Sequence, residues 1–468
     1  MIDFTGTYTD QYQLTMAQVY FQTGHKDQRA VFDYFFRKLP FGSGYAVFAG
    51  LEDLLDVLED LRFDEADLEY LKEQGLDPAF INYLKDFHFK GNIYASREGD
   101  LVFPTRPVLQ VEGNIIEAQI VETLLLNILN FQTLVATKAS RMRWVAGDRR
   151  LVDFGLRRAQ GVGGYHASRA AFIGGFDATS NVRAGRDFGI PVSGTMAHSF
   201  IESYDEELAA FRAFAEGRPD TCVLLVDTYD TLKSGVPNAI TIAKEMEKRG
   251  HRLRGIRLDS GDLAWLSKES RKMLDSAGLE YVKIAASNQL DEYVIRSLLE
   301  QKAPIDMYGV GTSLVTGQPD AALDGVYKLV LAAGQPRIKL SETVTKITIP
   351  NMKQVYRMAS GSGGWIGADV VALVEEGDIK SMYHPFDPHK SMSVEKYRKE
   401  PLLETVMEGG ERSSAPRPLA DIAEYARERL SLLPPEFKRF ENPHIYKVGL
   451  SDGLKKERDE LIEAHRKA

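Results

Sequence analysis

DFGLRRAQGVGGYHASRAAFIGGFDATSNVRAGRDFGIPVSGTMAHSFI, residues 153–201, is the most informative stretch of this chain. Two short apolar runs within it end at a glycine and then present polar side chains. One run ends at Gly155 and leads to Arg157, and the other ends at Gly194 and leads to His198. Strands that stop at glycine and then present such residues are typical of an α/β barrel, which displays its chemistry at one rim.

The pattern continues on both sides of this stretch, from about residue 150 to residue 330. Short apolar runs alternate with helical segments, such as a helix predicted to start at a capping box in residues 203–206 and to stop at Gly217. This repetition of strand, loop and helix indicates parallel strands. Its spacing is too irregular for an ideal (β/α)₈ barrel, so we expect an α/β fold with a distorted or incomplete barrel. The runs predicted as strands are residues 151–154, 190–193, 223–226, 253–258, 282–286 and 307–310.

Changes of pattern divide the chain into three segments. Residues 1–130 mix aromatic-rich strands with helices and predict an N-terminal α+β domain, whereas residues 131–335 carry the irregular barrel with the active site. Residues 336–468 switch to hairpin patterns, predicted to pack on the N-terminal domain, followed by a charged helical tail. An apolar stripe predicts a long helix over residues 117–146, which we expect to bridge domains or to enter an oligomer interface.

The composition excludes several classes of protein. The 468 residues are 44% hydrophobic and 27% charged, as in ordinary soluble domains. A net charge of −9 argues against nucleic acid or an anionic membrane as the main partner. The absence of a signal-peptide pattern and of any apolar run near ~20 residues predicts a cytoplasmic protein. The single Cys222 excludes an internal disulfide and a multi-cysteine zinc site, and its apolar surroundings predict a buried thiol.

Polar residues follow each predicted strand, and their composition suits a phosphorylated sugar. Arg157 and Arg257 offer forked donors for a carboxylate or phosphate, and Asp259 can accept from ribose hydroxyls or hold Mg²⁺. The glycine, backbone N–H groups and hydroxyls of residues 311–313 suit a phosphate. The rim residues, by strand end, are Phe154 and Arg157; Ser180 and Asn181; Thr195, His198 and Ser199; Asp227 and Asp230; Arg257, Asp259, Ser260 and Asp262; Ser287 and Asn288; Gly309, Gly311, Thr312 and Ser313.

Purely structural roles remain open for several of these residues. Arg257 and Asp259 can form an ion pair across one strand end, and Thr195 can simply cap a helix. Gly309 and the residues after it can be a plain turn, and Tyr12 can belong to an ordinary core.

The sequence has no complete match to the common nucleotide-binding motifs. Residues 161–166 (GVGGYH) resemble GxGxxG, but the last position is histidine and no strand comes directly before it. No Gly-Lys dipeptide occurs, so there is no Walker A loop. Residues 224–231 only partly match the phosphoribosyl-diphosphate motif of non-barrel phosphoribosyltransferases. We therefore interpret Asp227 and Asp230 as rim residues that can bind Mg²⁺ together with the diphosphate.

Six motifs in family order give the chain a specific resemblance to the nicotinate phosphoribosyltransferase family over essentially its full length. The resemblance implies an irregular α/β barrel and a second α+β domain built from both ends of the chain. It also implies a homodimer whose active sites are completed across the interface. The motifs are residues 9–16 (TDQYQLTM), 35–42 (FFRKLPFG), 154–161 (FGLRRAQG), 194–199 (GTMAHS), 257–262 (RLDSGD) and 309–312 (GVGT).

The resemblance also implies roles for individual residues. Nicotinate would stack between Phe154 and the Tyr12 of a second copy, while Arg257 would hold its carboxylate. His198 would be phosphorylated by ATP, with Mg²⁺ as cofactor and Asp227 as a candidate ligand. The remaining assignments are Thr195 and Ser180 near the nicotinate carboxylate; Asp259 on the ribose hydroxyls; Gly311 and Thr312 on the 5-phosphate; Arg37, Lys38 and Arg157 on the diphosphate; and Ser287 and Gly309 within the same phosphoribosyl diphosphate site.

The implied reaction is ATP-stimulated transfer of phosphoribosyl from 5-phosphoribosyl 1-diphosphate to nicotinate, with His198, Asp259 and Arg257 as catalytic residues. Its transition state has oxocarbenium character, so carboxylates and Mg²⁺ matter more than a general base. The missing Walker A loop suggests that ATP uses the phosphoribosyl diphosphate pocket. The alternatives are the nicotinamide-specific sister enzyme, quinolinate phosphoribosyltransferase, and a non-catalytic barrel that binds a phosphometabolite.

Overall fold

The computed structural model describes residues 4–361 and 363–467 in two compact units. Unit 1 combines Met1–Thr137 with Ala322–Ala468, and unit 2 is Lys138–Ala321. The first division falls inside helix α6 (Glu122–Ala146), seven residues after the boundary expected from the sequence. No helix in the described residues is long and apolar enough to span a membrane.

Unit 2 contains a six-stranded parallel sheet in the order β7-β6-β11-β10-β9-β8. Neighbours in this sheet follow one another in the chain, except that the last strand pairs with the first, as in a barrel. Thr179 forms a parallel bridge to Val192 beyond β7, and within the described residues no pairing joins that edge to β8. The irregular α/β barrel predicted from the sequence is therefore confirmed. The strands are β6 (Arg150–Asp153), β7 (Ala178–Thr179), β8 (Val223–Leu225), β9 (Gly255–Leu258), β10 (Lys283–Ser287) and β11 (Met307–Val310).

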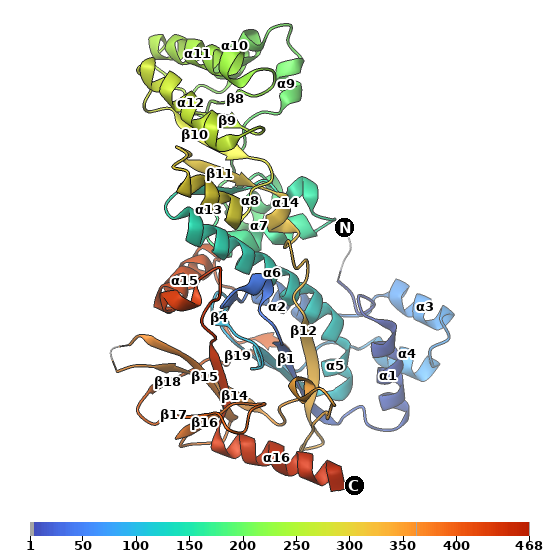
Figure 1. Ribbon diagram of the computed structural model, residues 1–468. Coiled ribbons are helices and arrows are strands. Elements are labelled where there is room, and N and C mark those ends of the chain that lie inside the picture. The colour runs from blue at the N-terminus through green and yellow to red at the C-terminus, as the bar shows by residue number, and fades with distance from the viewer. Residues whose placement is uncertain (1–3, 362, 468) are drawn as a thin grey trace. The chain divides into compact units, whose positions relative to one another are not determined.

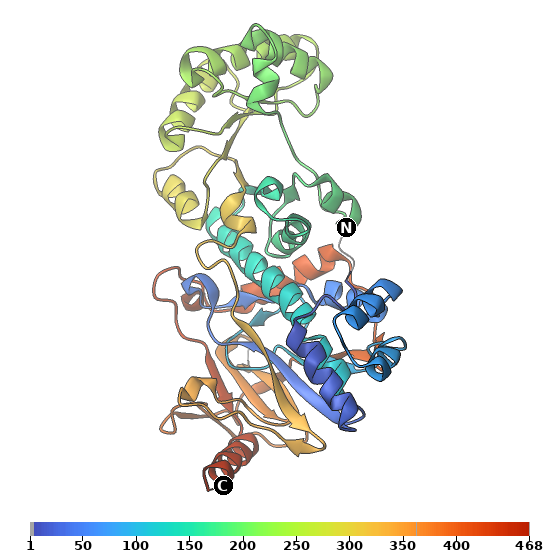
Figure 2. The ribbon, with the colours of Figure 1, turned by 90° about the vertical axis from the view of Figure 1, so that its right-hand side faces the viewer.

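Helix α12 packs against β9 and β10, α11 packs against α12, and α10 packs against α11. These helices lie together at one end of unit 2 in both views (Figures 1 and 2). One helix start was wrong: α9 ends at Glu202, and α10 begins at Glu207 rather than at residue 203. The Ser203 hydroxyl donates to the carbonyl of Phe200 and closes the preceding helix instead of capping the next one. The helices are α7 (Gly163–Ile173), α8 (Val182–Phe188), α9 (His198–Glu202), α10 (Glu207–Gly217), α11 (Val236–Lys248), α12 (Leu263–Ser276), α13 (Glu292–Glu300) and α14 (Thr312–Val315).

Unit 1 is built on a seven-stranded sheet in the order β13-β12-β1-β5-β3-β19-β20, with antiparallel neighbours. The aromatic run predicted as a strand is β1 (Arg29–Phe36), and Phe32 of β1 stacks on Tyr327 with ring centroids 4.7 Å apart. β12 (Gly325–Ala332), which the sequence analysis counted with the barrel, pairs with β1. The other strands are β3 (Asn92–Ala95), β5 (Leu109–Asn114), β13 (Gln335–Pro336), β19 (Glu404–Glu408) and β20 (Glu411–Arg412).

A second sheet of unit 1 comes entirely from the C-terminal segment, in the order β17-β16-β21-β15-β14-β18. Helix α16 (Asp452–Lys467) packs against β15 and β16 (Figure 1). The strands are β14 (Lys353–Ala359), β15 (Trp365–Leu373), β16 (Ser381–Tyr383), β17 (Ser391–Ser393), β18 (Arg398–Pro401) and β21 (Lys447–Leu450). The remaining elements of unit 1 are α1 (Gln11–Gln22), α2 (Leu51–Asp60), α3 (Glu65–Glu73), α4 (Pro78–Leu84), α5 (Ile115–Ile120), α15 (Leu419–Leu432), β2 (Ala46–Val47) and β4 (Leu101–Val102).

The predicted burial of the Cys222 thiol is confirmed. Its side chain is inaccessible to solvent just before β8. Burial raises the pKa of the thiol to about 12, so the group is protonated at neutral pH and packs as a small apolar residue.

Candidate active site

Arg257 joins three segments at the carboxyl end of the barrel. Its Nε donates to Ser287 Oγ on β10 (2.9 Å), and its Nη1 donates to Thr195 Oγ1 (3.2 Å). Nη1 also donates to the carbonyl of Met196 (3.2 Å), and Nη2 donates to Asp259 Oδ1 (2.9 Å). The ion pair that the sequence analysis raised as a structural alternative therefore exists, and it forms part of a wider rim network.

Asp259 is the fixed negative charge of this network. Its Oδ1 accepts a short hydrogen bond from Ser287 Oγ as well as the bond from Arg257. Burial by itself would raise the pKa of this carboxyl, but the Ser287 hydrogen bond and the Arg257 charge outweigh burial, and the pKa lies below its ordinary value. Asp259 is therefore ionised at neutral pH and can stabilise positive charge beside it.

His198 is the first residue of α9 and lies next to Asp259. Its Nε2 is 3.8 Å from Asp259 Oδ2, and its Nδ1 forms a hydrogen bond with Thr228 Oγ1 (3.1 Å). When Nδ1 carries the proton and donates to Thr228, Nε2 keeps a lone pair. The side chain is 38% exposed, so part of the imidazole is accessible from solvent.

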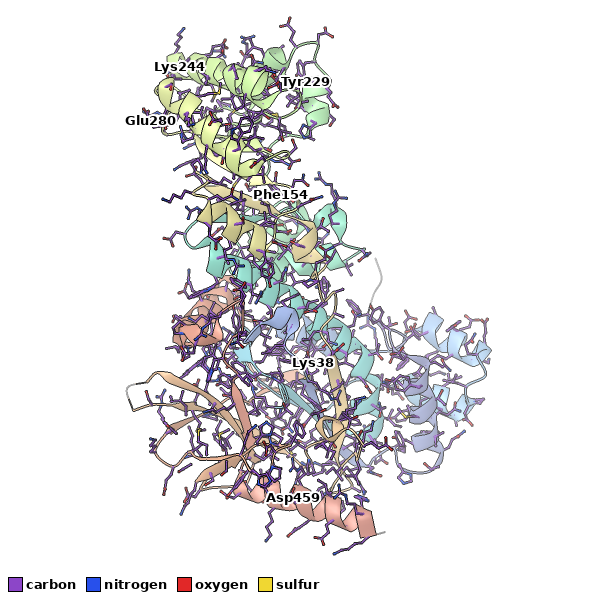
Figure 3. The ribbon with its side chains drawn as sticks, in the orientation of Figure 1. Lys38, Phe154, Tyr229, Lys244, Glu280 and Asp459 are labelled. Carbon is purple, nitrogen blue, oxygen red and sulfur yellow. The ribbon has the colours of Figure 1, made fainter. Side chains whose placement is uncertain are left out.

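A cavity of about 340 Å³ opens beside these groups. The Arg257 guanidinium lies over the Phe154 ring at 5.5 Å, and Phe154 follows the end of β6 (labelled in Figure 3). An aromatic face below an arginine suits a flat ring that carries a carboxylate. The lining residues are Phe154, Leu156, Arg157, Ser180, Gly194, Thr195, Met196, Ala197 and Arg257.

Gly309 makes room for the Phe154 ring. A Cβ on this glycine would lie 2.4 Å from two carbon atoms of that ring. Gly309 was predicted as part of the phosphoribosyl diphosphate site, and its position adds a steric reason for glycine at the end of β11.

Asp153 supports the rim from below and was missed from the sequence. It is 1% exposed, and its Oδ1 accepts from the Gly155 N–H (2.8 Å). Its Oδ2 accepts from Ser168 Oγ (2.7 Å) and Thr179 Oγ1 (2.8 Å). Burial outweighs these bonds and raises the pKa of Asp153. Because Gly155 follows Phe154, this carboxylate holds the turn that carries the aromatic wall.

One carboxylate oxygen of Asp227 has no hydrogen-bond partner. Its Oδ2 accepts from the Asp259 N–H and from Ser260 Oγ, both at 2.7 Å, whereas its Oδ1 is buried and has no hydrogen-bond partner. The described residues contain no group of three or more carboxylate, histidine or cysteine side chains arranged to hold a metal ion. The free oxygen fits Mg²⁺, which commonly takes one or two carboxylates and completes its shell with water and substrate phosphates.

In the expected phosphate site around β11 and α14, one of the predicted hydroxyls is already engaged. Gly311 and Thr312 follow the end of β11, where α14 begins. Ser313 is buried and its hydroxyl donates to the carbonyl of Leu290 (2.6 Å), so that proton is already used. Arg157 is exposed in the turn after β6 and reaches the cavity lining.

Tyr12, Arg37 and Lys38 belong to unit 1, whereas the barrel rim belongs to unit 2. Tyr12 is 50% exposed on α1, which excludes the alternative of an ordinary core residue. Lys38 is exposed after β1 (labelled in Figure 3).

Arg37 belongs to a basic group that sequence reasoning missed. Its Nε is buried without a hydrogen-bond partner. Burial lowers the pKa of Lys328 on β12, and the charges of Arg37 and Lys339 add to this effect. Strand pairing brings these residues together across the chain, so no local motif could identify the group.

Comparisons with known proteins agree with this geometry. Family models of nicotinate phosphoribosyltransferase match residues 7–130 (N-terminal domain), 149–360 (the family) and 352–458 (C-terminal domain). A nicotinate phosphoribosyltransferase of Bacillus subtilis is 46% identical over 96% of this chain and 94% of its own length. One of Caenorhabditis elegans is 39% identical over 95% of this chain and 91% of its own length.

Solved structures give the same result. The crystal structure of human nicotinic acid phosphoribosyltransferase aligns with a TM-score of 0.87 and 33% identity, and it covers 97% of this chain and 99% of the human chain. The nicotinate-nucleotide pyrophosphorylase of Pyrococcus furiosus aligns with a TM-score of 0.72 and 25% identity over 91% of this chain and 95% of its own. Sequence, architecture and rim geometry agree, and the chain belongs to the nicotinate phosphoribosyltransferase family, which serves NAD salvage.

Proposed function

We propose that the protein transfers phosphoribosyl from 5-phosphoribosyl 1-diphosphate to nicotinate, forming nicotinate mononucleotide and diphosphate, and that ATP stimulates this reaction. The observation that carries the proposal is the pairing of Arg257 with Phe154 beside the ionised Asp259. The pyridine ring stacks on the aromatic wall. The guanidinium, with Thr195 and Ser180 nearby, donates hydrogen bonds to the carboxylate. A neutral amide would forfeit the charge-assisted part of that interaction.

The chemistry needs no general base, because the pyridine nitrogen attacks C1 of the ribose with its own lone pair. As the bond to diphosphate breaks, positive charge develops on the sugar. Asp259 supports the ribose hydroxyls and that charge, and Arg257 keeps Asp259 ionised and oriented. Gly311 and Thr312, with Ser287 and Gly309, are the candidates for the 5-phosphate end of the substrate.

Mg²⁺, when bound, neutralises the negative charge that builds up on diphosphate, and the free Oδ1 of Asp227 is its candidate protein ligand. The donor set of this chain offers no cysteine cluster for zinc.

His198 is proposed to take the γ-phosphoryl group of ATP on Nε2. This nitrogen forms the new bond to phosphorus, ADP leaves, and Nδ1 stays in its hydrogen bond with Thr228. The phosphohistidine adds negative charge near Asp259 and would attract cations and order the diphosphate site. With no Walker A loop in the chain, we propose that ATP uses the phosphoribosyl diphosphate pocket, so that the two ligands exclude each other.

Unit 1 is proposed to complete the site of a second copy in a homodimer. The half-exposed Tyr12 would cover the free face of the nicotinate ring, and Arg37 and Lys38 would approach the diphosphate. The buried, unpartnered Nε of Arg37 supports an anion there. We place the enzyme in the cytoplasm, with no nucleic acid or membrane partner.

Product formation with nicotinate or nicotinamide, with and without Mg-ATP, tests the proposal in the wild type and in His198→Ala. We expect nicotinate mononucleotide from nicotinate only, and loss of the ATP stimulation in His198→Ala. His251→Ala is the matched control, because His251 lies in the segment after α11, outside the rim residues, and pairs with Asp220. Turnover of nicotinamide would identify the protein as the nicotinamide-specific sister enzyme. Turnover of neither base would favour a non-catalytic barrel that binds a phosphometabolite.

A further inference from the structure

A second cavity lies entirely within unit 1, and its lining contains none of the residues assigned to the proposed reaction. It occupies about 800 Å³, within the range of small-molecule sites in proteins. Its walls come from β16, β17 and β21 in the second sheet, and from two loops of the N-terminal segment. The lining residues are Leu39, Ser43, Gly44, Pro104, Thr105, Met382, His384, Pro385, Phe386, His389, Lys390, Ser391, Met392, Pro443, His444, Ile445, Tyr446, Lys447 and Val448.

The floor of this cavity is held rigidly by buried charges. Tyr446 is 8% exposed, its ring stacks on Phe103 with an interplanar angle of 7°, and its hydroxyl donates to Asp369 Oδ1 (2.6 Å). Asp369 in turn pairs with Arg357 (3.0 Å) and Arg106 (2.9 Å), and both arginines are inaccessible to solvent. A floor fixed in this way gives a preformed surface rather than one that a ligand must create.

The cavity walls are apolar and flat in several places. Phe386 is half-buried, and Pro104, Pro385 and Pro443 also line the cavity and add rigid rings to its walls. Ile445 is 82% exposed, an unusual degree for a large aliphatic side chain that lines a cavity. Burial of such surface by a ligand with a flat apolar body is favourable.

The lysines and histidines of the lining suit an anion. The lining has two lysines and three histidines and no aspartate or glutamate, although the whole chain carries a net charge of −9. Lys390 pairs with Asp387 (3.0 Å), whereas no acidic group of the described residues pairs with Lys447. Nδ1 of His384 accepts from the Phe386 N–H (3.1 Å), so the neutral ring carries its proton on Nε2 as a donor.

We propose that this cavity binds an aromatic organic phosphate of nucleotide size. Its ring lies against the Phe386, Tyr446 and proline faces, and its phosphate is held by Lys447 with the histidines. Charge complementarity selects the anion, and the volume and flat walls select the aromatic body. The site is separate from the barrel rim in sequence and in unit, and it does not depend on the proposed phosphoribosyl transfer.

Photo-crosslinking with 8-azidoadenosine 5′-monophosphate on the full-length protein locates such a ligand, because mapped peptides report where it binds. We expect label in peptides that cover residues 382–392 or 443–448, in addition to any label from the barrel. Unlabelled adenosine and inorganic phosphate should each compete about tenfold or more weakly than adenosine 5′-monophosphate, since each supplies half of the recognition.

Two variants separate the charge argument from the volume argument. Lys447→Glu should weaken binding at the mapped site about tenfold or more, and Ser391→Trp should block it by bulk while leaving every charge in place. Lys248→Glu makes the same charge change outside the lining and should bind like the wild type. Thermal unfolding confirms that each variant is folded.

Two results overturn the proposal. One is label confined to barrel peptides, and the other is equal labelling of the cavity peptides in the wild type, Lys447→Glu and Ser391→Trp. Label that appears only after the protein is diluted to monomers also contradicts the proposal, because it would mean that a second copy covers the cavity in the dimer. Nicotinate turnover, measured in the same variants without nucleotide, reports on the proposed reaction independently.

Discussion

Asp153 is a buried carboxylate that accepts from three neutral donors around the turn carrying Phe154. In Asp153→Ala the Gly155 N–H and two hydroxyls lose this acceptor, at about 1–3 kcal/mol for each donor left unsatisfied. We also expect the KM for nicotinate to rise about tenfold, because the aromatic wall shifts while the reacting groups remain. Urea unfolding and steady-state kinetics measure the two effects.

Asp153→Asn should recover most of the loss, since its carbonyl oxygen can still accept from Gly155 and the hydroxyls can reorient. Asp275→Ala, at an exposed i,i+4 pair of α12, is the control for removing a carboxylate. An unchanged nicotinate KM in Asp153→Ala would show that the turn holds its position without this residue.

Asp259 gives a stability term with a defined dependence on pH. Its pKa in the folded protein lies below its ordinary value of 3.8, so the unfolded chain binds the proton more readily. The stabilisation is therefore fully present above the unfolded pKa and is lost as pH falls through the folded pKa. Urea unfolding between pH 7 and pH 3 should show the stability of the wild type relative to Asp259→Asn declining only below about pH 5. A difference that grows on acidification would contradict the assignment.

Most rim residues could be predicted because apolar runs mark where each strand ends. Asp259 and His198 follow such runs, Arg257 is the last but one residue of a run, and the structure brings the three together. The direction of an individual side chain could not be predicted. Ser313 has a hydroxyl at a strand end, but the carbonyl of Leu290 claims it, and that contact depends on packing between elements.

β11 pairs with β6, and Gly309 of β11 lies against the ring of Phe154, which follows β6. Gly309→Ala would place a methyl group where the Phe154 ring lies, and the ring must move. We expect the KM for nicotinate to rise by about tenfold or more, with a smaller effect on phosphoribosyl diphosphate. Steady-state kinetics with each substrate varied in turn measures this selectivity.

Gly217→Ala is the matched control, because nothing lies within 4 Å of the added Cβ. If both alanine variants bind nicotinate equally well, the ring has room to adjust and the steric argument fails.

Elements with a local signal were predicted better than those defined by their partner. The parallel barrel strands alternate with helices, so their type and order follow from the sequence. β12 is an equally apolar strand, yet it pairs with β1 near the other end of the chain. The alternation of residues along a strand does not identify the strand with which it pairs. Local signals can also mislead, since Ser203 matches a capping box but closes the helix before it.

At the scale of the whole molecule, the proposed homodimer can be tested by complementation. Tyr12→Ala and Arg257→Ala should each be inactive or nearly so. When two differently tagged variants are co-expressed, each mixed dimer has one site with both substitutions and one with neither. One of the two sites in each mixed dimer is intact, so about half of the wild-type activity should return in the mixed dimers.

Activity is measured on dimers purified through both tags, and each variant alone, passed through the same steps, is the control. No recovery in the mixed dimers would mean that Tyr12 serves the barrel of its own chain.

The pairing of β1 with β12 has a consequence for synthesis of the protein. Phe36 pairs with Gly325, so the central sheet of unit 1 cannot close until the whole of unit 2 has been made. At about 5–20 residues per second, this interval is roughly 15–60 s on the ribosome. The aromatic face of β1 stays without its neighbour during that time. Chaperones that shield nascent chains therefore matter more here than in a protein whose domains are continuous in sequence.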